Sequence, residues 1–134
     1  MKGIADTGFL IALANARDLH HSWALRMAEQ VTEPLLTCEP VLAEAAFHLR
    51  NSALGLEMIA EDLVALAFDC NDHLPQLAVL AARYADRQPD LADLCLIRMS
   101  ELYPQHSIVT VDRDFRLYRR NKREVIPIIM PPGR

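Results

Sequence analysis

Short apolar runs alternate along the chain with stretches in which apolar residues recur at helical spacing. The runs predict strands at 2–5, 35–37, 65–68, 107–111 and 125–129. The helical spacing predicts helices at 9–14, 22–31, 40–51, 56–64, 77–84 and 90–103. Because strands separated by helices indicate an α/β layer fold, we expect a mainly parallel sheet with helices on both faces.

Proline and glycine positions set the expected ends of the helices. Pro40 suits the first turn of a helix, and Gly55 is expected to end that helix. Pro89 is expected to end the helix before Asp90. The chain has no internal repeat, low-complexity tract or linker, so residues 1–134 are predicted to form a single domain.

Composition narrows the class of protein. Half of the 134 residues are hydrophobic, which allows a sizeable core, yet no apolar run approaches the ~20 residues of a membrane span. The N-terminal residues do not form a signal-peptide pattern. Cys38, Cys70 and Cys95 are far apart in sequence and form no C-x-x-C pair, which argues against zinc and a disulfide framework. We therefore expect reduced, mostly buried thiols in a cytoplasmic protein without membrane association.

Four acidic residues stand at unusual places in this pattern. Asp6 and Asp112 each follow a predicted strand, whereas Glu44 and Asp93 interrupt apolar helical stretches. The carboxyl ends of parallel strands meet at one edge of a sheet, where ligands bind, so Asp6 and Asp112 are expected in one site. Buried carboxylates need a positive partner, and a hard cation such as Mg²⁺ or Mn²⁺ prefers oxygen ligands. Such a cation activates water against phosphodiesters and stabilises the charge that develops.

Neighbouring residues extend this candidate site. Asp90 shares a helix face with Asp93, and Asp114 follows Asp112, so both are secondary candidates for the metal. Thr7 and Thr110 flank the acids at the strand ends, and their hydroxyls are candidates to orient a carboxylate or a water.

Each acid also has a plainer interpretation. Asp6 and Asp90 suit the N-cap of the helices that follow them, and Asp114 suits a solvated turn. Glu44 and Asp93 could occupy exposed positions of amphipathic helices. The joint occurrence of the four acids at these positions favours the metal site over these separate interpretations.

Positive charge is concentrated near the C-terminus. The net charge of −4 argues against nucleic-acid binding over the whole surface, but six of the fourteen Lys and Arg residues lie within eleven positions. A basic run beside Asp112 could contact RNA phosphates, dock an acidic partner segment, or form a solvated face. Its members are Arg113, Arg116, Arg119, Arg120, Lys122 and Arg123.

The remaining residue types point to no other site. His20 and His21 are adjacent and diverge, and His48, His73 and His106 lack a partner at metal-ligand spacing. The sequence contains no P-loop and no serine or cysteine nucleophile motif. Trp23, with Leu19 and Met27 on the same helical face, is expected to lie in the core or at a dimer contact.

Four short motifs together resemble those of the PIN-domain ribonucleases. Asp6-Thr7-Gly8-Phe9-Leu10 is similar to the family's opening motif, and Val41-Leu42-Ala43-Glu44 resembles its second acidic motif. Asp90-Leu91-Ala92-Asp93 resembles the third, and Thr110-Val111-Asp112-Arg113-Asp114-Phe115 the fourth. Their order and spacing match over essentially the whole chain, and its length is similar to that of VapC-type toxins of prokaryotic toxin–antitoxin pairs. Gly8 departs from the family pattern, in which many members have serine.

The resemblance implies a single PIN-like domain over 1–134, with three α/β/α layers around a sheet of about four to five strands. It implies a Mg²⁺- or Mn²⁺-dependent endoribonuclease that acts on RNA, an antitoxin protein that masks the site, and a homodimer. It also implies that the acids of the metal site are Asp6, Glu44, Asp93 and Asp112.

Two other functions remain open from the sequence. The first is a catalytically silent PIN-like module that binds RNA or protein. The second is a phosphoryl-transfer protein, which also places acids at strand ends in an α/β fold. The second is disfavoured because no acidic pair follows the first strand and Lys2 precedes that strand.

Overall fold

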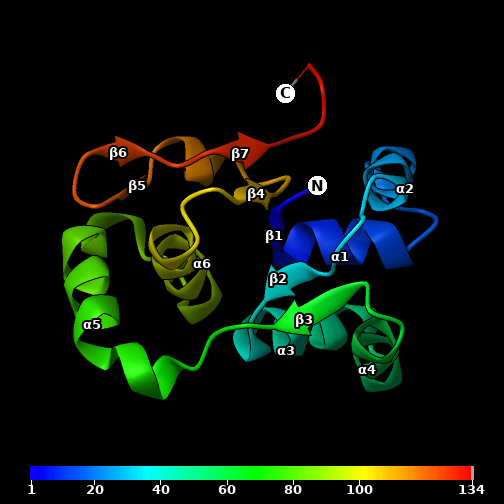
Figure 1. Cartoon of the computed structure of the whole chain (residues 1–134), viewed down its shortest axis with the longest axis horizontal. Helices are drawn as coiled ribbons and strands as arrows, with labels where there is room; N and C mark the ends of the chain where they lie inside the picture. Colours follow the sequence, from blue (N-terminus) through cyan, green and yellow to red (C-terminus); the bar gives the residue numbers. More distant parts are fainter. Residues whose placement is uncertain (134) are drawn as a thin grey trace.

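The computed structural model describes residues 1–133 and contains a five-stranded sheet with helices on both sides (Figure 1). The sheet strands are β1 (Gly3–Ala5), β2 (Leu35–Thr37), β3 (Val64–Leu66), β4 (Ser107–Val109) and β7 (Ile128–Ile129). The α-helices are α1 (Thr7–Ala14), α2 (His21–Glu29), α3 (Glu39–Leu49), α4 (Ser52–Ala60), α5 (Leu74–Arg83) and α6 (Leu91–Leu102). Three 3₁₀ turns are η1 (Cys70–His73), η2 (Ala85–Arg87) and η3 (Arg113–Arg116), and β5 (Arg119–Arg120) pairs with β6 (Glu124–Val125) as a separate ribbon.

All neighbouring strands of the main sheet are parallel, in the order β3-β2-β1-β4-β7. The chain moves outward from β1 through β2 to β3, then returns across the sheet to β4 on the other side of β1. The strand order therefore reverses between β1 and β4, and this is the place where open α/β sheets form a ligand crevice. The predicted α/β class and mainly parallel sheet are confirmed.

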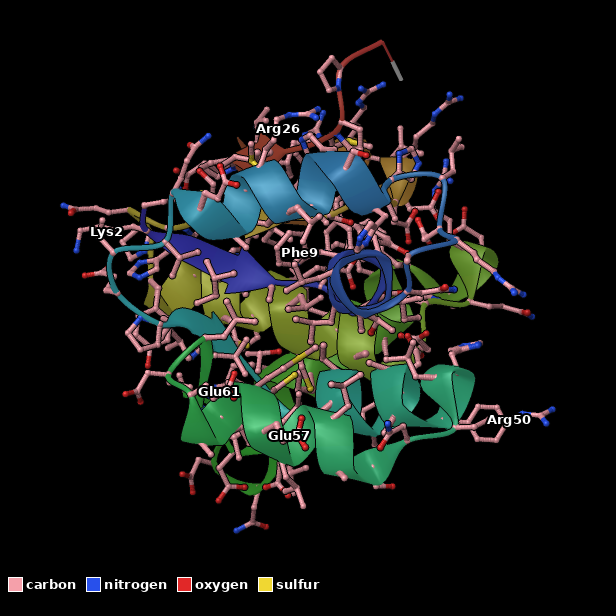
Figure 2. The ribbon with its side chains drawn as sticks, turned by 90° about the vertical axis from the view of Figure 1, so that its right-hand side faces the viewer. Lys2, Phe9, Arg26, Arg50, Glu57 and Glu61 are labelled. Atoms are coloured by element: carbon pink, nitrogen blue, oxygen red, sulfur yellow. The ribbon has the colours of Figure 1, made fainter. Side chains whose placement is uncertain are left out.

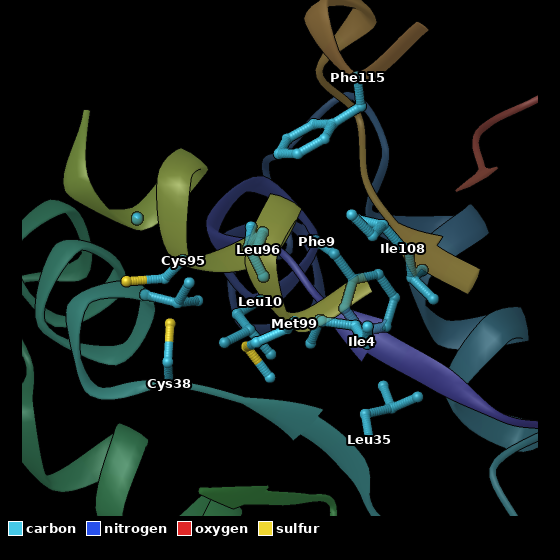
Figure 3. Packing of buried hydrophobic residues seen from close by; sticks show 14 of the residues in the cluster. Ile4, Phe9, Leu10, Leu35, Cys38, Cys95, Leu96, Met99, Ile108 and Phe115 are labelled. Carbon is cyan, nitrogen blue, oxygen red and sulfur yellow. The ribbon is translucent and has the colours of Figure 1, made fainter. Parts of the chain in front are cut away.

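The helices enclose a continuous apolar core. Figure 1 shows α1 and α2 on one side of the sheet and α5 and α6 on the other. Phe9 of α1 is fully buried and meets Trp23 of α2 edge to face, with ring centroids 5.9 Å apart. Figure 2 shows Phe9 in the interior, whereas the labelled charged side chains point outward, and Figure 3 shows Ile4, Leu35 and Ile108 of three strands packed together. Trp23 thus lies in the core.

No helix within residues 1–133 is long and apolar enough to cross a bilayer.

Three predicted boundaries are wrong. The helix predicted at 56–64 ends at Ala60, and Val64 already belongs to β3. Gly55 lies inside α4, because α3 already ends at Leu49 and its C-cap Arg50 adopts a left-handed backbone (φ 53°). Asn51 then caps α4 by accepting a hydrogen bond from the Leu54 N–H. The strand predicted at 125–129 is divided between β6 and β7. Pro127 separates the two parts, since proline has no N–H to donate to a ladder.

Candidate active site

The first two acids stand at the carboxyl ends of adjacent strands. β1 and β4 pair in parallel with Ala5 opposite Val109, and the Asp6 N–H continues the ladder by donating to the Val109 carbonyl at 3.1 Å. Asp6 is also the N-cap of α1, and its Oδ1 accepts a hydrogen bond of 2.6 Å from the Thr7 N–H. The capping role and a place in the site therefore coexist at Asp6.

The Thr110 hydroxyl connects the two strand-end acids. Thr110 is fully buried, and its Oγ1 donates to Asp6 Oδ2 at 2.5 Å while accepting from the Asp112 N–H at 2.9 Å. The Asp112 carboxylate in turn accepts from the Asp114 N–H at 2.9 Å and caps η3. Thr110 thus orients Asp6, as the sequence predicted, and fixes the position of the backbone that carries Asp112.

The other two acids come from helices. Glu44 lies in the middle of α3, and Asp93 occupies the first turn of α6. Asp90 and Asp93 form a capping box, in which the Asp93 N–H donates to Asp90 Oδ1 at 2.9 Å and the Asp90 N–H donates to Asp93 Oδ2 at 3.3 Å. This reciprocal pairing satisfies two N–H groups at the helix start and holds both carboxylates near its positive end.

A single cavity of about 250 Å³ brings these acids together. Its lining includes Asp6, Glu44, Asp90, Asp93 and Asp112, whereas Asp114 is not part of it. A larger hollow of about 700 Å³ lies along the end of α3 and the start of α4, but no carboxylate lines it. The carboxylates are therefore gathered in the smaller cavity.

Burial, together with the negative charge of neighbouring carboxylates, raises the pKa values of the acids. Burial raises the pKa of Asp6 to about 6, and the charges of Asp112 and Glu44 add to this effect. Burial raises the pKa of Asp93 to about 8, together with repulsion from Asp90, Asp6 and Asp112. Burial likewise raises the pKa values of Glu44 and Asp112. The described side chains thus supply too little positive charge to balance these carboxylates.

Comparison with known proteins agrees with this arrangement. The family model for the PIN domain matches residues 4–121, which is most of the chain. The chain belongs to the PIN domain family. Its fold is similar to the crystal structure of VapC20 of Mycobacterium tuberculosis, which is described as a sarcin–ricin loop cleaving toxin, with a TM-score of 0.66 and 20% sequence identity. The match covers 78% of this chain and 85% of that one, and no curated protein sequence matches this chain.

The donor chemistry of this PIN domain fits a hard divalent cation. All five acids of the cavity offer oxygen ligands, which Mg²⁺ and Mn²⁺ prefer. The Thr7 hydroxyl lies beside Glu44 in the wall of the cavity and helps to stabilise its ionised form. Within residues 1–133, however, no three side chains are already arranged around one metal position. Ligation therefore requires side-chain rotation or bridging waters in addition to the carboxylates.

The basic run does not form one surface. Arg120 is 4% exposed, and its guanidinium donates to the carbonyls of Ser100 (2.8 Å) and Pro104 (3.3 Å) and pairs with Glu124 at 3.0 Å. The expectation that Arg120 contacts RNA or a partner is therefore wrong, because its buried side chain holds the β5–β6 ribbon against α6.

The other basic residues of the run lie at different places on the molecule. The guanidinium of Arg119 donates to three backbone carbonyls of its own turn, at 2.8, 3.0 and 3.2 Å. Lys122 lines a different hollow, between α5, α6 and the ribbon. Arg113 is exposed and directly follows Asp112, so it remains a candidate for phosphate contact, and Arg116 and Arg123 are also exposed.

Two features of the cavity were missed from the sequence. His48 lines the cavity, and its spacing of four residues from Glu44 on α3 was the available signal, because residues four apart share a helix face. Gly8 has a steric reason to lack a side chain, since a Cβ there would lie 2.5 Å from Val111 Cγ2. Val111 thus fills the space that a serine at position 8 would need.

Proposed function

We propose that this PIN domain is a metal-dependent endoribonuclease that hydrolyses phosphodiester bonds of RNA. The observation that supports this most strongly is the convergence of carboxylates from two strand ends and two helices on one cavity, with raised pKa values and neither lysine nor arginine among the described residues that line it. A protein that only needed a stable fold would gain nothing from this repulsion. Bound Mg²⁺ or Mn²⁺ would neutralise the carboxylates and the charge that develops on the phosphate.

The residues of the chain have distinct parts in this proposal. The residues that would hold the cation are Asp6, Glu44, Asp93 and Asp112, with Asp90 at the rim. Thr110 keeps the carboxylate of Asp6 directed into the cavity through its 2.5 Å hydrogen bond. Exposed Arg113 is positioned by sequence to bind a backbone phosphate of the RNA beside Asp112.

Cleavage of RNA by the purified protein tests this proposal. Asp6→Asn keeps the shape of the side chain and removes its charge, so cleavage should fall by more than about 100-fold while circular dichroism remains unchanged. Asp86→Asn is the matched control, because Asp86 is exposed on η2 and does not line the cavity. Cleavage should also require Mg²⁺ or Mn²⁺, and undiminished activity in excess EDTA would refute the metal-dependent mechanism.

A catalytically silent PIN-like module is the second candidate. The observation that favours it is that no three described side chains form a ready-made metal site. Calorimetric titration with Mn²⁺ separates the two functions. Binding that Asp93→Asn abolishes would support the nuclease, whereas no binding of Mn²⁺ to the wild-type protein would support the silent module.

We further propose that the protein acts as the toxin of a toxin–antitoxin pair and that a small antitoxin masks its cavity. The similarity to a VapC toxin supports this role. Large apolar side chains such as Leu19 (77% exposed), Leu56 (68%) and Phe47 (79%) provide surface that a protein partner, including a second copy of the chain, could cover. Expression of the wild-type chain should arrest bacterial growth, and expression of Asp6→Asn should not.

An RNA panel would define the substrate. A sarcin–ricin loop hairpin is a suitable first member because it is the target named for VapC20. Transfer RNA and unstructured messenger RNA are the comparison substrates. Selective cleavage of one of them would assign the substrate, and equal cleavage of all three would show that recognition lies outside this domain.

A further inference from the structure

Folding brings the three cysteines, which are far apart in sequence, into one cluster. Cys38 is the N-cap of α3, Cys70 begins η1, and Cys95 lies on α6 two residues after Asp93. The Sγ atoms of Cys70 and Cys95 are 3.4 Å apart. Figure 3 shows the side chains of Cys38 and Cys95 close together, so Cys95 lies between the other two thiols, and all three cysteines are free thiols.

Exposure distinguishes the members of this cluster. Cys38 and Cys95 are fully buried, with 0% of each exposed, whereas Cys70 is half-buried. A small oxidant dissolved in water therefore reaches Cys70 first, and the thiol in contact with Cys70 is that of Cys95. The two residues thus meet the spatial requirement for a pair in which one thiol is oxidised and its neighbour completes the bond.

We propose that Cys70 and Cys95 are a redox modification site that forms an intramolecular disulfide on reaction with hydrogen peroxide. The Cys70 sulfur attacks the peroxide, its O–O bond breaks, and the products are a sulfenic acid at Cys70 and one water. The Cys95 sulfur then displaces the hydroxyl group from Cys70 and releases a second water. In total, two thiols and one H₂O₂ give one disulfide and two waters, so the peroxide takes up the two electrons that the thiols lose.

The local structure accommodates this bond. An S–S bond of about 2.05 Å requires the two sulfurs to approach by roughly 1.4 Å from their present separation of 3.4 Å. Cys70 begins a four-residue 3₁₀ turn, whose Asp69 cap accepts a hydrogen bond from the Asn71 N–H, and this turn lies between β3 and α5. Such a short turn can shift more readily than α6, which carries Cys95.

The disulfide would tie this turn to the helix that carries Asp93. It closes the chain between positions 70 and 95, which restricts the unfolded state more than the folded one. The oxidised protein should therefore unfold at a higher temperature than the reduced protein, by about 5–10 °C. Dithiothreitol should reverse the change.

Tryptic mapping tests the site directly, because each cysteine falls on its own peptide. Cleavage after arginine gives peptide 27–50 with Cys38, peptide 51–83 with Cys70 and peptide 88–98 with Cys95. The full chain is treated with a few equivalents of H₂O₂, its remaining thiols are blocked with N-ethylmaleimide, and the digest is analysed without reductant. We expect peptides 51–83 and 88–98 to be joined, with a loss of two hydrogens, and peptide 27–50 to carry one maleimide.

Two variants keep the outcome decisive. Cys70→Ser should abolish the cross-link, whereas Cys38→Ala should retain it, with circular dichroism to confirm that both are folded. The proposal is overturned if all three thiols of the wild-type protein still react with maleimide after peroxide. It is also overturned if Cys38 is the partner joined to Cys95, if the bond forms only between two molecules, or if Cys70 advances to sulfinic acid without a cross-link.

Discussion

Replacing Asp6 with asparagine should change the stability of the protein in a way that depends on pH. Asp6 is 5% exposed, and burial among other carboxylates raises its pKa from the ordinary value of 3.8 to about 6. Its ionised form is thus less stable in the folded protein than in the unfolded chain. Asparagine has nearly the same shape but no charge at any pH, so the variant lacks this penalty.

The pKa shift sets the size of the effect. A difference of one pKa unit corresponds to 1.36 kcal/mol, so the rise from 3.8 to about 6 corresponds to roughly 3 kcal/mol. For a domain of this size, that is a change in melting temperature of about 10 °C. Loss of the negative charge at position 6 also lowers the pKa of Asp93, which acts in the same direction.

The sign follows from the two protonation equilibria. Below about pH 3, Asp6 is mostly neutral in both the folded and the unfolded chain, and the penalty is nearly absent. Between about pH 3 and 6 the unfolded side chain ionises while the folded one keeps its proton, so wild-type stability falls as pH rises. Above about pH 6 the penalty is complete. Asparagine also replaces the hydrogen bonds from Thr7 and Thr110 imperfectly, but that cost is nearly independent of pH.

Urea unfolding at pH 4 and pH 7.5, in EDTA, measures this effect. The free energy of unfolding of Asp6→Asn, relative to wild type, should be roughly 2–2.5 kcal/mol more favourable at pH 7.5 than at pH 4, because the unfolded side chain is already partly ionised at pH 4. Asp86→Asn, at an exposed position, should show little such change. If the difference between Asp6→Asn and wild type is the same at both pH values within about 0.5 kcal/mol, the electrostatic account of the cavity is wrong.

Three further predictions concern the cation, the packing and the basic run. At pH 7.5, excess Mg²⁺ should raise the melting temperature of the wild-type protein by a few degrees, and Asp93→Asn should lose that response in differential scanning fluorimetry. Gly8→Ser should cost about 1–3 kcal/mol in urea unfolding, because its Cβ meets Val111 Cγ2 at 2.5 Å, and a second substitution, Val111→Ala, should recover part of the loss. Arg120→Met should cost about 2–4 kcal/mol because buried carbonyls lose their donor, whereas Lys122→Met should stay within about 0.5 kcal/mol in the same assay.

The strands and the acids at their ends were readable from the sequence for one physical reason. A parallel strand buried on both faces must be a short apolar run, and the first charged residue after it marks the place where the chain leaves the core. Asp6 follows β1 and Asp112 lies three residues beyond β4, which are the two strands on either side of the switch point. The same two acids that end apolar runs in the sequence therefore lie side by side at one edge of the sheet.

Other features depend on contacts that a sequence pattern does not contain. The clustering of Cys70 with Cys95 requires η1 to lie against α6, and nothing in the spacing of the cysteines reports that contact. Arg120 belongs by sequence to a basic run, yet the antiparallel pairing of β5 with β6 turns it into the interior, where it meets the carbonyl of Ser100. Tertiary structure therefore buries Arg120, although an arginine in a basic run is expected at the surface.

The cavity illustrates how a fold can position like charges without a partner of opposite charge. Each carboxylate is held by local hydrogen bonds of its own element: Asp6 caps α1, Asp112 caps η3, and Asp93 belongs to the capping box of α6. Local capping offsets part of the mutual repulsion, so the acids can approach one another in the folded protein before any cation is present. Burial raises their pKa values most, the remaining repulsion adds to it, and both would favour binding of a divalent cation. The same interactions that lower the stability of the protein above about pH 6 are thus the ones that would give the cavity its affinity for metal.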